Sequence, residues 1–382
     1  MNRYRGVDCP GFVPCNNPRH AGCESLVIQP LLMYNAVRNG CNGAAQQHRY
    51  ITAEAHMNER VQEIVDAYYE SEEEGIRQLR KLMTQLCKAA LDTGFAKHAR
   101  ADLIAVCHML IEAMRYDTAE RSGSQWDSYD DTLLKVCYAA LRPLEAMHPD
   151  CALLGMQLSM VLAEVQFSDG EEAEGCGYLS QAAEKFVRLL DVRGERRIGV
   201  IAAGLRRAAY MAACCDGYDE TVERQLKQIC RSVADAGIYI SLNTTDRSAE
   251  YLGDVAVACS EYAFVRHIDD AYAVLNFSLG LLGELIRNDY GKFREAAETI
   301  LVSLSISMRV EIELGDAGSQ ALRDASELLV RVFTMVSILA ETDSAYWSAE
   351  RDRQWKCMCV LAGMEDREYL QQCIERLGDA AP

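Results

Sequence analysis

Proline is scarce over most of this chain of 382 residues. Four of the seven prolines precede Leu31 and one is the final residue, so only Pro143 and Pro149 lie between Leu31 and Ala381. Proline opposes helix more strongly than any other residue, and Ala, Leu, Glu, Arg and Met fill this stretch instead. Sustained alternation of Val, Ile and Thr, the pattern typical of strands, is also missing. The body is therefore predicted to be all-helical.

Basic charge is the second shortage. The chain has 39 Lys and Arg against 57 Asp and Glu, a net charge of −18. Nucleic-acid binding depends on Lys and Arg that neutralise phosphates, so direct binding to a phosphate backbone is not expected and a basic protein partner is easier to accommodate. Residues 1–56 carry five Arg against three acids, which leaves −20 on the rest. General solubility is the alternative role of that acidic surface.

Long apolar runs are missing as well. No run of eighteen apolar residues lacks a charge, so no membrane span is predicted. The first residues, MNRYRGVDCPGF, lack the apolar core of a signal peptide, so secretion is not expected. Most of the sixteen Cys sit among apolar residues at helical spacing, where a reduced Cys acts as a small hydrophobe. These features together predict a cytoplasmic protein.

Turn-forming residues recur at a nearly fixed interval. Breaks between helix-patterned segments fall near residues 73, 121, 169, 216, 269, 316 and 364. The intervals between these positions are 48, 48, 47, 53, 47 and 48 residues. Helical hairpins that cannot bury their own apolar faces stack on their neighbours. The spacing predicts about seven antiparallel hairpins in residues 54–382, preceded by an irregular Cys- and Pro-rich arm at 1–53. The longer interval comes from 238–246, either an insertion loop or an extra turn of helix.

The second helices share small residues followed by larger apolar ones, as in the segment YLSQAAEKFVRLLD at 178–191. That segment resembles the second helix of a tetratricopeptide repeat. The resemblance is at superfamily level and covers roughly 54–378, with a period near 48 instead of about 34 and without the consensus Trp, Gly, Tyr and Pro positions. It implies a right-handed superhelical array whose first helices line a concave groove for a peptide, a protein segment or a small signalling ligand.

The arm contains one cluster of metal-ligand residue types, with the spacing Cys-x5-Cys-x4-His-x2-Cys. The four residues are Cys9, Cys15, His20 and Cys23. Four such ligands separated by turn residues can surround one structural zinc ion, and a small arm with few apolar residues benefits from such a staple. Free thiols in an unstructured or docked arm, and disulfides, remain alternatives.

A candidate partner groove follows from Tyr and Arg residues on the first helices. Tyr outnumbers Phe by 18 to 8, and its polar tip suits half-exposed binding surfaces. If the resemblance holds, these residues face inward and clamp an acidic or carboxylate-bearing segment. Contacts between hairpins are the alternative role. The candidate residues are Arg206, Arg207, Tyr210, Tyr251, Tyr262, Arg266 and Arg309.

Catalysis is not predicted. The sequence contains no GxSxG, HExxH, phosphate-binding loop or kinase-like set. The neighbours Cys107 and His108 project from a helix in different directions, which argues against a nucleophile and base pair. The predicted function is a protein- or peptide-binding adaptor or regulatory subunit with no cofactor beyond the zinc of the arm. The alternatives are an acidic inhibitor that occupies the basic channel of a nucleic-acid enzyme, and a small-ligand or peptide sensor.

Overall fold

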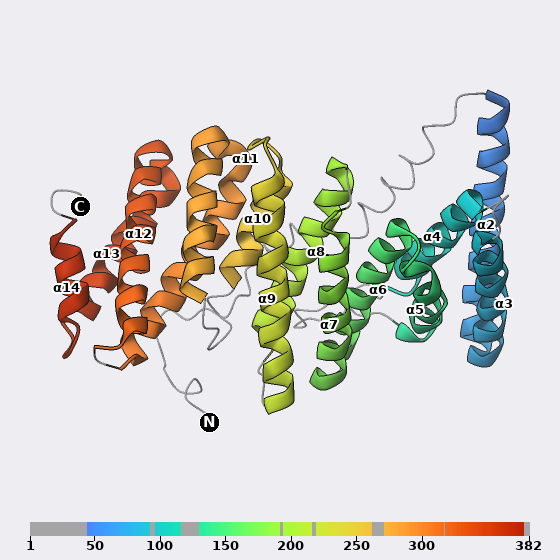
Figure 1. Ribbon diagram of the computed structural model, residues 1–382, viewed down its shortest axis with the longest axis horizontal. Coiled ribbons are helices and arrows are strands. Elements are labelled where there is room, and N and C mark those ends of the chain that lie inside the picture. The colour runs from blue at the N-terminus through green and yellow to red at the C-terminus, as the bar shows by residue number, and fades with distance from the viewer. Residues whose placement is uncertain are drawn as a thin grey trace.

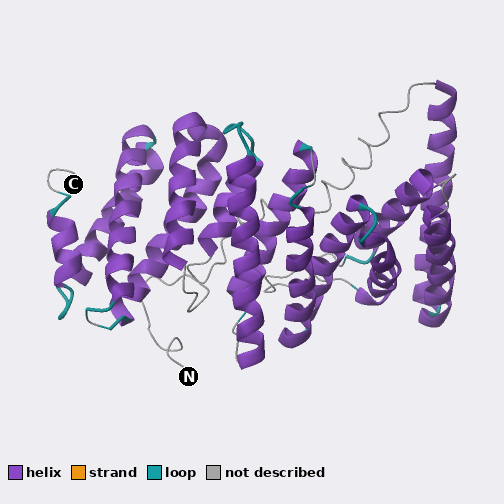
Figure 2. Cartoon of the chain, in the orientation of Figure 1, coloured by secondary structure: helices purple, strands orange, loops and turns teal. Residues whose placement is uncertain are grey.

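The computed structural model describes an all-helical protein (Figure 2). It describes residues 44–91, 96–115, 130–191, 194–215, 219–261, 271–316 and 318–377, with side chains from Met57 onward. Of these described residues 88% lie in thirteen helices and none lies in a strand. The all-α prediction is confirmed.

Most of the helices follow one another with short connections, and residues 114–130 form a longer one between α4 and α5. In chain order they are α2 (Ala44–Glu70), α3 (Glu72–Leu91), α4 (Ala96–Ala113), α5 (Asp131–Glu145), α6 (Pro149–Ser168), α7 (Glu172–Leu189), α8 (Glu195–Cys214), α9 (Glu220–Asn243), α10 (Tyr251–Ser260), α11 (Ala271–Leu314), α12 (Gln320–Thr342), α13 (Ser344–Ala362) and α14 (Glu368–Glu375). The long α11 contains a kink, because Asp289 has non-helical angles of φ −157° and ψ 92°. It therefore acts as two helices.

Each helix packs against the next helix in sequence and, in most cases, against the next but one. Contacts join α2 with α4, α4 with α6, α6 with α8 and α8 with α10, and they join α3 with α5, α7 with α9 and α12 with α14. We call α2, α4, α6, α8, α10, the part of α11 after Asp289, and α13 the first-helix layer. The other helices form the second-helix layer. The helices follow chain order along the long axis, from α2 at one end to α14 at the other (Figure 1).

Helix α6 separates two apolar cores. One face packs into the N-terminal core through Cys151, Leu154, Leu158, Leu162 and Val165. The other face packs into the C-terminal core through Leu153, Met156, Met160, Ala163 and Phe167. Among the described helices α6 alone is long and apolar enough to cross a membrane, and it is almost entirely buried inside the protein. Its apolar composition is explained by contact with two cores.

The observed helix ends differ from the predicted ones at two places. Helix α2 begins at Ala44, ten residues before the predicted start of the first hairpin at residue 54. Ala and Gln favour helix, which outweighed the preceding Asn and Gly. Helix α9 continues to Asn243 and buries Ile240, so the stretched interval is mainly extra helix and not an insertion loop.

The small and larger apolar residues expected on the second helices lie on the buried face of α7 and α12, and in α11 Leu281 is buried and Phe277 is half-buried. There Ala273 is exposed, whereas Val274 and Ser278 are buried. The buried Ser278 hydroxyl donates to the Ala256 carbonyl of α10 at 2.7 Å. This hydrogen bond removes the cost of a buried hydroxyl and lets the helix turn that face inward.

Candidate functional site

The predicted groove residues that the structure describes all lie in the first-helix layer. Arg206, Arg207 and Tyr210 are on α8, Tyr251 begins α10, and Arg309 is half-buried on α11. The other two groove residues, Tyr262 and Arg266, lie outside the described residues.

The predicted zinc ligands also lie outside the part of the chain that the structure describes. These are Cys9, Cys15, His20 and Cys23. Within the described part, no group of three or more His, Cys, Asp or Glu side chains is arranged to hold a metal ion. The zinc site of the arm therefore stays a prediction.

Arg206 joins three helices of the first-helix layer. Its Nη1 lies 3.1 Å from Oδ1 of Asp254 on α10, and its Nη2 lies 3.0 Å from Oε1 of Glu295 on α11. The Asp254 side chain is 27% exposed and that of Glu295 is 68% exposed. Burial raises the pKa of Asp254, and the Arg206 charge opposes this increase. Arg206 therefore has one partly buried partner and one partner largely in water.

Arg207 lies in a more closed environment. It forms an ion pair with Glu164 of α6, whose side chain is 6% exposed, and its guanidinium lies 5.5 Å from the centre of the Tyr210 ring. Glu164 lies on α6, the helix that separates the two apolar cores. Arg207 thus makes the contact between hairpins that was the alternative role for the groove residues.

We expect Arg207→Ala to lower the free energy of unfolding by about 3 kcal/mol, because it takes the cation away from a buried carboxylate. Denaturant unfolding followed by circular dichroism measures this loss. The double variant E164Q/R207A removes the buried charge as well, so it should recover at least half of the loss. Equal stability of Arg207→Ala and the wild type would contradict this role.

The C-terminal ends of α8 and α10 carry groups with shifted pKa values. Burial raises the pKa of Glu261, just after α10, to about 7, although Arg206 acts in the opposite direction. Burial and the neighbouring Cys214 raise the pKa of Tyr210. Tyr251, at the start of α10, lies with its hydroxyl 3.3 Å from Oγ1 of Thr244. Tyr210, Tyr251 and Glu261 are thus half-buried residues of the first-helix layer.

The raised pKa of Glu261 predicts a pH-dependent effect on stability. In the unfolded chain this acid ionises near its ordinary pKa of 4.5, so the wild type loses stability as the pH rises from about 4.5 to 7. Glu261→Gln does not titrate. We expect it to equal the wild type near pH 4.5 and to be about 1–3 kcal/mol more stable at pH 8. Unfolding curves at both pH values test this, and a constant difference between the proteins would contradict it.

A polar cluster between α5, α6 and α7 was not predicted. The Lys185 ammonium of α7 donates to the hydroxyls of Tyr138 (3.0 Å) and Ser159 (2.9 Å) and to the carbonyl of Gly155 (3.2 Å). It also lies 3.2 Å from Oε1 of Glu145, without hydrogen-bond alignment. A Cβ at residue 155 would lie only 1.8 Å from that oxygen, so glycine there admits the carboxylate.

This cluster contains residue types that elsewhere act as nucleophile and base. Here the Lys185 side chain is 7% exposed and Ser159 is completely buried. Each ammonium hydrogen already has an acceptor among Tyr138, Ser159 and Gly155. The arrangement therefore clamps three helices together. Its one signal in the sequence is a lysine inside the apolar stripe of α7.

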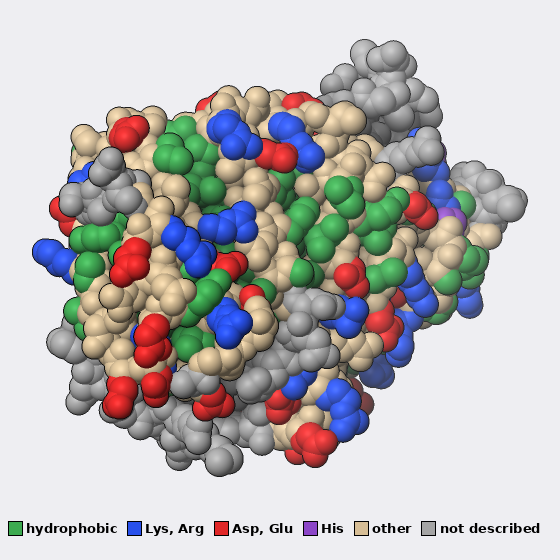
Figure 3. Space-filling view, turned by 60° about the vertical axis from the view of Figure 1, so that its left-hand side comes forward, with side chains coloured by type: hydrophobic (Ala, Val, Ile, Leu, Met, Phe, Trp, Pro, Cys, Tyr) green, Lys and Arg blue, Asp and Glu red, His purple; other side chains and the backbone are tan. Residues whose placement is uncertain are grey.

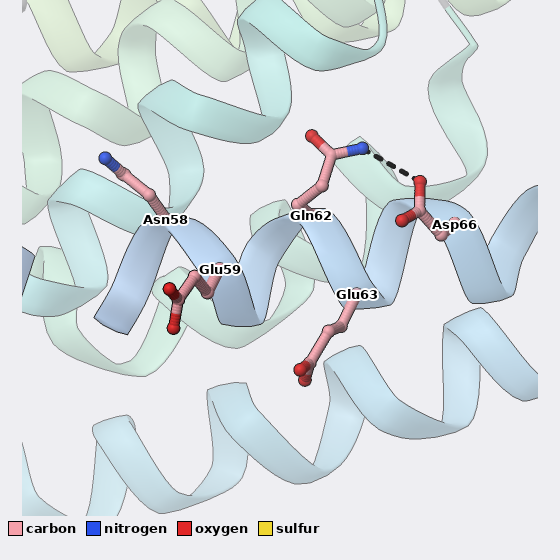
Figure 4. A pocket seen from close by; sticks show the side chains of 5 residues that line it. All are labelled: Asn58, Glu59, Gln62, Glu63 and Asp66. Atoms are coloured by element: carbon pink, nitrogen blue, oxygen red, sulfur yellow. Dashed lines mark hydrogen bonds between the residues drawn. The ribbon is translucent and has the colours of Figure 1, made fainter. Parts of the chain in front are cut away.

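Two surface hollows among the described residues are candidate ligand sites. One, of about 470 Å³, is lined by Asn58, Glu59, Gln62, Glu63 and Asp66. All five side chains come from α2, and Gln62 donates to Asp66 at 2.8 Å (Figure 4). A smaller hollow of about 50 Å³ lies where the ends of α7 and α9 meet α8. The first is the polar outer face of one helix, and the second is smaller than an ordinary ligand pocket.

Neither a family model nor a curated protein matches this chain. Its assignment therefore depends on the helical packing and on the contacts described above.

Proposed function

We propose that this chain is a non-catalytic helical-repeat scaffold that binds a protein or peptide along its first-helix layer, as an adaptor or regulatory subunit in the cytoplasm. The observation that supports this most strongly is the packing order. Consecutive helix pairs follow one another along the long axis, and neighbouring first helices contact each other. Arrays of this kind offer one long face to a partner.

The finer architecture that we propose is a right-handed superhelix of about seven hairpins, similar to tetratricopeptide arrays. Its support is the agreement between the turn spacing and the helix pairs, including the division of α11 at Asp289. The double contact of Arg206 adds to this, because its side chain reaches both α10 and the second half of α11. One side chain can contact three neighbouring first helices more easily where these helices converge on the concave side of a superhelix.

Arg206 is the groove residue best suited to meet a partner. Its second ion pair is with the largely exposed Glu295, and an exposed pair contributes about 0–1 kcal/mol. A carboxylate of a partner can replace Glu295 at little cost and form a bidentate contact. Arg207, in contrast, is held by the buried Glu164.

Affinity purification of the tagged full chain from its native host tests the proposal. We expect wild type to retain a stoichiometric protein partner at both low and high salt, and Arg206→Ala to retain about tenfold less. Arg224→Ala is the matched control, because Arg224 forms an exposed pair with Glu220 in the second-helix layer. Circular dichroism checks that all three proteins are equally helical. Retention of no protein, or equal retention by Arg206→Ala, would contradict the proposal.

The salt dependence separates this proposal from the acidic-inhibitor alternative. An association that depends on the charge of −20 on residues 57–382 should disappear at high salt. On the face that Figure 3 shows, acidic and basic side chains are interspersed with apolar ones. This mixture favours a partner held by local contacts over one held by a continuous acidic field.

A further inference from the structure

Two cysteines from neighbouring helices lie close together where the start of α7 meets the end of α8. The Sγ atoms of Cys176, near the start of α7, and Cys215, directly after α8, are 4.0 Å apart. A disulfide requires about 2.05 Å, so the two sulfurs must approach by roughly 2 Å. Cys215 is already outside the helix, with φ −79° and ψ 130°. Its backbone is extended instead of helical, which makes this approach feasible.

Accessibility distinguishes this pair from the other thiols. None of the twelve cysteines in the described part of the chain is joined in a disulfide. Cys176 is fully buried, but Cys215 is half-buried and can meet a reagent from solvent. The thiols of Cys107 and Cys137 also interact, and both of these residues are fully buried. The Cys107 and Cys137 pair therefore provides an internal comparison without an accessible thiol.

We propose that Cys176 and Cys215 form a reversible intramolecular disulfide by exchange with a small disulfide such as oxidised glutathione. The Cys215 thiolate attacks one sulfur of the reagent, which forms a mixed disulfide and releases one glutathione thiolate. The Cys176 thiolate then attacks the Cys215 sulfur and releases the second glutathione. Two protein thiols are oxidised and one glutathione disulfide is reduced to two thiols, so atoms and electrons balance.

The disulfide would connect the start of α7 with the end of α8 and so link two consecutive helix pairs at the ends opposite their chain connection. The hydrogen bond with Cys215 and burial both raise the pKa of Cys176, so the second step should become faster as the pH rises. Excess reduced thiol reverses both steps. None of this requires a partner protein, so the inference stands or fails separately from the proposed function.

The test uses the full chain incubated with oxidised glutathione under native conditions. Remaining thiols are alkylated, and the protein is cut with trypsin and a glutamate-specific protease. These cuts place Cys176 alone in the peptide 175–184, and Cys214 and Cys215 together in 208–220. We expect mass spectrometry to find these two peptides joined, with the join removed by dithiothreitol. The yield should exceed that of any Cys107 to Cys137 link by at least tenfold.

Variants identify the sulfur that takes part. We expect Cys214→Ser to form the joined peptide as the wild type does, and Cys215→Ser to lose it. Circular dichroism establishes that each variant is folded before oxidation, and the wild-type digest alone decides whether the link forms. No joined peptide in the wild type, or a link that depends on Cys214 instead of Cys215, would overturn the proposal.

Discussion

Lys185→Ala is expected to lower the free energy of unfolding by about 3–5 kcal/mol. The ammonium of Lys185 lies 3.2 Å from the Glu145 carboxylate, and the two side chains are only 7% and 9% exposed. The variant leaves this carboxylate buried without its cation. It also removes the donor that joins Tyr138 on α5 to Ser159 on α6. Denaturant unfolding followed by circular dichroism measures the loss.

Two controls show whether burial of the pair is the cause. The double variant E145Q/K185M removes both charges, so it should regain at least half of the stability that Lys185→Ala loses. Lys135→Ala is the exposed counterpart, because Lys135 is 42% exposed and pairs with Asp131 one turn away. That change should cost less than about 0.5 kcal/mol. A similar small cost for Lys185→Ala would contradict the clamp between the three helices.

Gly75→Ala is expected to produce the second large loss, about 3 kcal/mol. Helices α2 and α3 are separated by one residue, and a Cβ at residue 75 would lie 2.5 Å from Cα and 2.8 Å from the backbone nitrogen of Tyr68. A backbone cannot rotate away as a side chain can, so the two helices must separate. Thermal and denaturant unfolding measure the effect.

The matched control for this change is Gly280→Ala in α11. A Cβ at residue 280 meets no atom within 4 Å, and alanine favours helix over glycine. Gly280→Ala should therefore gain about 0.5–1 kcal/mol. A Gly75→Ala protein as stable as the wild type would show that α2 and α3 do not approach as closely as described.

The helices were largely predictable from local sequence signals. Pro149 begins α6, as expected for a proline in the first turn, where its missing N–H is not needed. Gly170, in the turn before α7, has a positive φ of 82°, which glycine adopts without strain. Signals of this kind act within a few residues, so helix ends can be predicted without knowledge of packing.

The polar contacts between helices were not predictable in the same way. Glu145 and Lys185 are 40 positions apart, and each lies in an ordinary helical segment. Their contact depends on how α5 and α7 rotate about their axes, which is decided by apolar packing around them. For the same reason Arg207, predicted as a groove residue, is held by Glu164 of the preceding first helix. The sequence predicted the layer of Arg206 and Arg207 but not their partners.

Cross-linking of the complex in extracts of the native host, with a lysine-reactive reagent, tests the central claim most directly. The first-helix layer carries the exposed lysines Lys97, Lys292 and Lys356. The second-helix layer carries Lys81, Lys135 and Lys227. We predict that peptides of a retained partner are linked mainly to the first set. Partner links mainly to the second set would contradict binding along the first-helix layer.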